Sequence, residues 1–90
     1  MTPLSFRRRA LAKVVFPDSF TAATGGVREV DSRAENVRDL SAELIARWPD
    51  LEDLLTKSAV AIDGQIYQDA FLEPIGVDSE VFFMARIEGG

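Results

Sequence analysis

Residues 36–49, with the sequence NVRDLSAELIARWP, determine how the rest of the chain is read. Asn36 is a residue type favoured at a helix N-cap, and Asp39 places negative charge in the first turn, where the helix dipole stabilises it. Apolar residues then recur at steps of three, four and four, the spacing of one helical face: Val37, Leu40, Leu44 and Trp48. Pro49 ends this pattern, because the residue before a proline is disfavoured in helical geometry. We predict one amphipathic helix.

Two strand patterns precede the helix. Residues 11–16 (LAKVVF) are apolar and partly β-branched, which is typical of a buried strand, and Pro17 ends them. Residues 24–26 (TGG) are a turn signal, and residues 27–31 (VREVD) alternate imperfectly. We predict a hairpin of two strands.

Strand patterns return after the helix. Residues 60–62 and 65–67 flank Asp63-Gly64, the strongest short signal for a β-hairpin. Residues 80–87 (EVFFMARI) form the last predicted strand. Strands mixed in this way with a single main helix predict an α+β domain in which one sheet packs on one helix.

Two connecting segments carry further apolar residues. Residues 51–55 (LEDLL) are expected to form a short turn that caps the core. In the loop of residues 71–75, Leu72 and Ile75 are expected to point inward. We divide the chain into an N-terminal extension (1–10), the domain (11–87) and a C-terminal tail (88–90).

The composition excludes many kinds of chemistry. The 90 residues include no cysteine, which excludes disulfides, thiolate zinc sites, iron–sulfur clusters and thiol nucleophiles. They include no histidine, which removes the commonest general base and metal ligand. The acidic group Asp50, Glu52 and Asp53 does not match the spacing of a calcium loop and is interpreted as solvated surface. No metal site is predicted.

The charge balance favours a basic protein partner. Ten Lys and Arg stand against 15 Asp and Glu, and three of the ten are the cluster at residues 7–9. The seven others leave the rest of the chain with a net charge of −8. An acidic body is not attracted to nucleic acid or to an anionic membrane.

The chain is expected to be cytoplasmic. Residues 5–11 (SFRRRAL) faintly resemble a twin-arginine export signal. The apolar segment that such a signal requires is interrupted by Lys13, Pro17 and Asp18. No apolar run approaches the roughly 20 residues of a membrane span.

The sequence closes with Glu88-Gly89-Gly90. Without a Cβ, two glycines pass through a channel too narrow for side chains and bring a carboxylate close to a nucleotide. The alternative is a frayed end without a function.

Several motifs in order, with this diglycine, support the first interpretation. They are TGG at 24–26, NVRDL at 36–40, RWP at 47–49, VAIDG at 60–64 and DSEVFF at 78–83. Together they resemble the motifs of the ubiquitin-like β-grasp sulfur carriers of the ThiS and MoaD family, over residues 11–90. The chain departs from the family pattern at Asp63, where Asn is usual, and lacks the Pro-Pro common before the tail of molybdopterin synthase small subunits.

The resemblance implies a fold and a function. The fold is a β-grasp, a mixed sheet of four to five strands packed on one main helix. The chain is then a carrier without catalytic activity and without a bound cofactor. An ATP-dependent, E1-like activating enzyme adenylates the carboxylate of Gly90, with Gly89 beside it, and sulfur displaces AMP to leave a thiocarboxylate. This group delivers sulfur to a biosynthetic enzyme, MoaE-like or thiazole synthase-like, with molybdopterin slightly favoured over thiazole or cysteine.

The last strand supplies candidate partner-binding residues. Because side chains alternate along a strand, Val81, Phe83 and Ala85 are expected in the core when the others face outward. The outward set and the residues that follow it are the candidates: Phe82, Met84, Arg86, Ile87 and Glu88. Arg86 is the main candidate for recognition, since its place relative to the last glycine matches a tail arginine of ubiquitin. A slip of one residue in register would exchange the two faces, and a helix or loop covering this face is the other alternative.

Two other functions stay open at this point. The same activated tail is equally suited to a protein modifier that is joined to lysines. A non-covalent β-grasp interaction module, for which the diglycine is incidental, is the third alternative.

Overall fold

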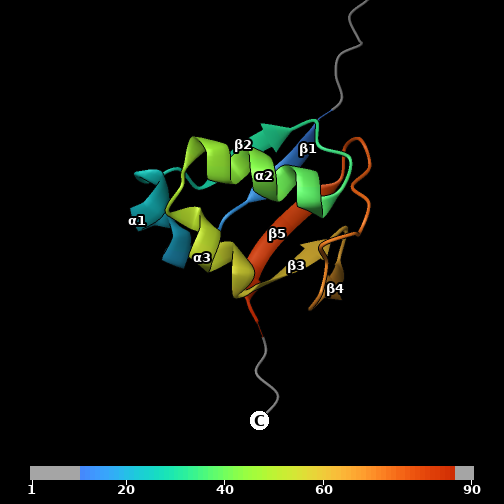
Figure 1. The fold of residues 1–90 in the computed structure, drawn as a ribbon. Helices are drawn as coiled ribbons and strands as arrows, with labels where there is room; N and C mark the ends of the chain where they lie inside the picture. The colour runs from blue at the N-terminus through green and yellow to red at the C-terminus, as the bar shows by residue number, and fades with distance from the viewer. Residues whose placement is uncertain (1–10, 87–90) are drawn as a thin grey trace, which may run out of the picture.

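A computed structural model describes residues 11–86; residues 1–10 and 87–90 lie outside the described part. Five strands form one sheet in the order β2-β1-β5-β3-β4, and α2 and α3 lie across one face of it (Figure 1). The elements are β1 (Ala12–Val15), η2 (Asp18–Phe20), α1 (Thr21–Thr24), β2 (Glu29–Ser32), α2 (Val37–Arg47), α3 (Leu51–Thr56), β3 (Ser58–Ile62), β4 (Gln65–Tyr67) and β5 (Glu80–Ala85). The predicted α+β class, with a mixed sheet on one main helix, is confirmed.

The first and last strands lie side by side at the centre of the sheet. β1 pairs parallel to β5, with Val14 opposite Val81, and antiparallel to β2. β3 pairs antiparallel to both β5 and β4. The sheet is therefore mixed, with β2 and β4 at its edges.

Helix α2 begins and ends where its sequence predicts. The Asn36 side chain accepts a hydrogen bond from the Asp39 amide at 2.8 Å, which satisfies one of the free donors at the helix start. Trp48, before Pro49, has the non-helical angles φ −135° and ψ 87°. The predicted apolar face packs on the sheet: Val37, Leu40 and Leu44 are buried, and Trp48 is partly buried.

Aromatic side chains fill the core between the helices and the sheet. The Phe16 ring lies 5.8 Å from that of Trp48 in an edge-to-face arrangement and 5.7 Å from that of Phe20. Phe20 also contacts Phe83 of β5, at 5.9 Å. Such pairs stabilise a core by about 0.5–1.5 kcal/mol each beyond their buried area.

The predicted hairpin at Asp63-Gly64 is confirmed. Both residues have positive φ, 50° and 88°, as a type I′ turn requires. The Asp63 carboxylate accepts hydrogen bonds from the Glu80 amide at 2.9 Å and the Ser79 hydroxyl at 2.8 Å. These bonds, that from Glu80 first, lower the pKa of Asp63, because they stabilise its ionised form.

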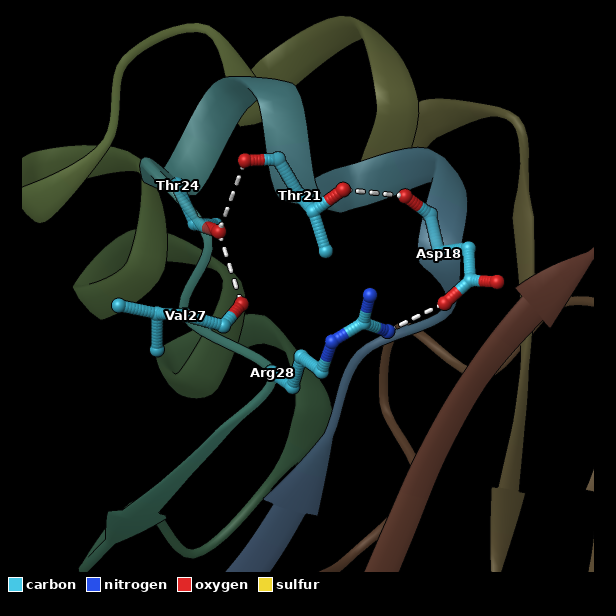
Figure 2. A network of polar contacts seen from close by, with 5 residues as sticks. All are labelled: Asp18, Thr21, Thr24, Val27 and Arg28. Atoms are coloured by element: carbon cyan, nitrogen blue, oxygen red, sulfur yellow. Dashed lines mark hydrogen bonds and ion pairs between the residues drawn. The ribbon is translucent and has the colours of Figure 1, made fainter.

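The connection between β1 and β2 contains helical structure that the sequence interpretation missed. Residues 18–24 form η2 and α1, and Gly25 ends α1 with φ 71°. Figure 2 shows the contacts that hold this connection. The buried Thr24 hydroxyl donates to the Val27 carbonyl at 2.8 Å, the Thr21 hydroxyl donates to the Asp18 carbonyl at 2.7 Å, and Arg28 forms an ion pair with Asp18.

Two expectations about connecting segments require correction. Residues 51–56 form the helix α3 instead of a short turn, and Leu51 is fully buried. Leu72 is 76% exposed, whereas Ile75 is buried as predicted. The Glu73 amide bonds to the Ala70 carbonyl at 2.8 Å and closes a turn that leaves Leu72 at its exposed tip.

Within residues 11–86, no helix has both the length and the apolar character that a bilayer crossing demands.

Candidate functional site

The burial of the β5 side chains agrees with the predicted register except at Ala85. Val81 and Phe83 are buried under the helices, while Phe82 is 40% exposed and Met84 is half-buried. Ala85 was expected in the core but is exposed. The helix layer leaves a groove of about 410 Å³ at this end of the sheet, lined in part by Ser58, the residue opposite Ala85.

A row of paired residues crosses the sheet at Phe82, on the face opposite α2. Phe82 is opposite Val15 of β1 on one side and Ala61 of β3 on the other, and Ala61 is opposite Ile66 of β4. Directly opposite residues project from the same face. A second pair, Met84 and Ala59, lies beside this row.

These residues form what we call the outer apolar surface: Val15, Ala59, Ala61, Ile66, Phe82 and Met84. The two alanines are buried; Ala59 is opposite Met84, and Ala61 lies between Phe82 and Ile66. Ile66 is 52% exposed, so it and Phe82 are the most prominent members. Exposed apolar clusters are common on surfaces through which proteins associate.

Charged residues border the outer apolar surface. Glu29, opposite Val15, forms an ion pair with Lys13 at 3.7 Å. Asp31 and Glu80 are the residues opposite Lys13 on its two sides. Three carboxylates against one amine make this border acidic, which favours a partner with basic residues around an apolar centre.

Arg86, predicted to face a partner, binds other parts of its own chain. Its guanidinium donates to the Gln68 carbonyl at 2.9 Å and the Thr56 carbonyl at 3.4 Å, and it forms an ion pair with Asp69. Its backbone amide donates to the Lys57 carbonyl at 3.2 Å. The side chain is 33% exposed, while that of Asp69 is 90% exposed.

The tail residues predicted to carry the chemistry lie outside the described residues. Ile87 and Glu88 were predicted to bind a partner, and Gly89 and Gly90 to carry the activated carboxylate. Their roles stay predictions.

The acidic residues after α2 lie on the surface. Asp50, Glu52 and Asp53 are exposed. Across residues 11–86, no three carboxylates converge in the way that a metal ion would need.

Of the outer apolar surface, sequence reasoning singled out only Phe82 and Met84, and it also missed the contacts of Arg86. Ile66 was not singled out, although counting outward from Asp63-Gly64 places it opposite Ala61. The place of Val15 in this surface follows only from the β1–β5 pairing, which joins strands far apart in the chain. The contact of Arg86 with Asp69, 17 residues away, has no local signal.

The structure is similar to those of several small β-grasp proteins. Small archaeal modifier protein 1 from Methanosarcina acetivorans superposes with a TM-score of 0.73 at 17% identity, over 92% of this chain and 99% of that chain. A chain of the BexX/CysO complex from Amycolatopsis orientalis superposes with a TM-score of 0.74 at 14% identity, over 88% of this chain and 99% of that chain. A protein classed as molybdopterin converting factor, subunit 1, from Pyrococcus furiosus superposes with a TM-score of 0.68 at 19% identity, over 88% of this chain and 100% of that chain.

These neighbours are β-grasp proteins of the ThiS/MoaD type, so the resemblance inferred from the motifs is confirmed at the level of the fold. No protein-family model matches the chain, and no curated protein matches it by sequence.

Proposed function

We propose that the chain is a sulfur carrier whose Gly90 carboxylate is activated by a partner enzyme. A carboxylate oxygen of Gly90 attacks the α-phosphate of ATP and releases pyrophosphate. Sulfide then displaces AMP at the acyl carbon and leaves a thiocarboxylate. This group donates its sulfur in cofactor biosynthesis, with molybdopterin favoured over thiazole or cysteine.

The observation that carries the proposal is the outer apolar surface on a fold of this type. A carrier has to be held by an activating enzyme and then by a sulfur acceptor. Phe82 and Ile66, which lie on either side of Ala61 and are both exposed, provide area for such contacts. The names of two similar structures, a CysO complex and a molybdopterin converting factor subunit, also support a carrier that works with other proteins.

The test uses the absence of cysteine. The protein is isolated from its own cells and treated with a thiol-alkylating reagent, and the intact chain and its C-terminal peptide are weighed by mass spectrometry. Because there is no cysteine, a label on that peptide identifies a thiocarboxylate. Alkylation is needed because exchange of oxygen for sulfur adds nearly the same mass as oxidation of Met84.

A labelled peptide ending at Gly90 is the expected result. A peptide that stays unlabelled after incubation with ATP, sulfide and the cell's activating enzymes overturns the carrier proposal.

A protein modifier is the second candidate, because two of the similar structures are small archaeal modifier proteins. A modifier joins its activated carboxylate to amines of other proteins. Peptides of cellular proteins that carry a Gly89-Gly90 remnant on lysine, lost when Gly90 is deleted, favour the modifier. A non-covalent module is the third alternative, and it would keep its partner binding after that deletion.

A further inference from the structure

Two segments that are far apart in the sequence meet at the side chain of Arg86. The guanidinium reaches the Thr56 carbonyl at the end of α3 and the Gln68 carbonyl in the segment after β4, and it pairs with Asp69 in that same segment. The Arg86 amide extends the β3–β5 ladder by its bond to the Lys57 carbonyl. We call this set of contacts the Arg86 clamp.

The clamp holds Arg86, the last residue that the structure describes, against two other segments. Four residues follow Arg86 in the sequence. Since an extended chain spans at most about 3.6 Å per residue, four residues reach at most roughly 14 Å from a fixed point. Loss of the clamp would release Arg86 itself, and the effective concentration of a chain end at a fixed point falls as the segment that connects it to the domain lengthens.

We propose that Arg86 is a positioning residue for activation of the tail. The clamp fixes the point from which residues 87–90 leave the domain, so that Gly90 meets the nucleotide site of the activating enzyme when the domain docks. This inference rests on the proposed function. It differs from the sequence-based hypothesis, in which the Arg86 guanidinium itself contacts the partner.

The two hypotheses predict different effects for Asp69. In the clamp, Asp69 acts only through Arg86, so Asp69→Asn and Arg86→Gln impair the same step and their effects are not additive. In direct recognition, Asp69→Asn frees the guanidinium and leaves activation intact or improves it.

The experiment measures ATP–pyrophosphate exchange by the activating enzyme on the full chain. The variants are Arg86→Gln, Asp69→Asn and the double variant, with Asp18→Asn as the matched control. Asp18 pairs with Arg28 beside β2, at the opposite edge of the sheet from the Asp69 pair. We expect a KM for the carrier raised about three- to tenfold by Arg86→Gln, less by Asp69→Asn, with kcat little changed.

The KM for the double variant should be no higher than that for Arg86→Gln alone, and the KM for the Asp18→Asn control should equal that for wild type. Hydrogen exchange at the Arg86 amide provides a readout without any enzyme, and it should speed up in both single variants. A normal KM for Asp69→Asn with an unchanged amide exchange rate overturns the clamp, even if Arg86→Gln fails to fold. No exchange of pyrophosphate with the wild-type chain overturns the proposed function instead.

Discussion

The Ser79 hydroxyl donates a hydrogen bond to the Asp63 carboxylate across 2.8 Å and ties the β3–β4 hairpin to the start of β5. Together with the bond from the Glu80 amide, it lowers the pKa of Asp63 below its ordinary value of 3.8. The unfolded chain therefore binds more protons than the folded chain between the two values, and stability rises with pH in that window.

We predict an acid-dependent loss of this contribution. The stabilising contribution of Asp63 is fully present above pH 3.8, and it is lost as the pH falls through the lowered pKa of the folded state. Asp63→Asn removes the titration, so the stability difference between wild type and variant should shrink on acidification. Urea unfolding from about pH 2 to about pH 6 measures this, with Asp53→Asn as the control. A difference that stays constant over this range would refute the linkage.

The outer apolar surface should bind the partner enzymes through Phe82. Phe82→Ala should weaken the complex about ten- to a hundredfold, because a partly exposed aromatic residue at the centre of such a surface is a typical binding hot spot. Phe71→Ala is the matched control, since Phe71 is 58% exposed but lies outside this surface. Calorimetric titration with the activating enzyme measures both. Equal losses for the two variants would show that the surface is not specific.

Thr24 should stabilise the connection between α1 and β2. Thr24→Val keeps the shape of the side chain but leaves the Val27 carbonyl without its donor, so we expect a loss of about 1 kcal/mol. Thr21→Val is a milder change, since the Asp18 carbonyl keeps the Thr21 amide as a donor. Thermal unfolding of both variants measures whether loss of the buried Thr24–Val27 bond lowers the stability more than loss of the Thr21–Asp18 bond.

The two leucines Leu51 and Leu72 should respond differently to truncation. Leu51→Ala removes a fully buried side chain and should cost about 2–5 kcal/mol. Leu72→Ala changes a side chain that is mostly in solvent and should fall within about 0.5 kcal/mol of wild type. Chemical denaturation measures both, and a large loss at Leu72 would show that it packs inward after all.

The parts of the fold that local chemistry controls were predictable from sequence. Asn36 and Pro49 bound α2 through capping and backbone sterics, and Asp63-Gly64 imposes the hairpin through its positive φ angles. Leu72 was placed wrongly because the tertiary environment, here a turn closed by Glu73 and Ala70, decides which apolar residue of a loop is buried.

In the candidate site too, local pattern was predictable from the sequence, whereas contacts between distant segments were not. Alternation along β5 predicted that Phe82 and Met84 face away from the helices. The neighbours that complete the surface, such as Val15, depend on a strand pairing over a long sequence separation. The contacts of Arg86 likewise depend on how distant segments fold, and no spacing rule reports them.

The parallel pairing of β1 with β5 has a consequence for synthesis in the cell. The centre of the sheet joins a strand made early to one made last among the five, and such long-range contacts form slowly. A chain released from the ribosome before β5 is made has no partner for β1 at the centre of the sheet, and its outer apolar surface is incomplete. If the outer apolar surface binds the partner enzymes as proposed, a product that ends before β5 cannot compete for them, because it lacks Phe82 and Met84.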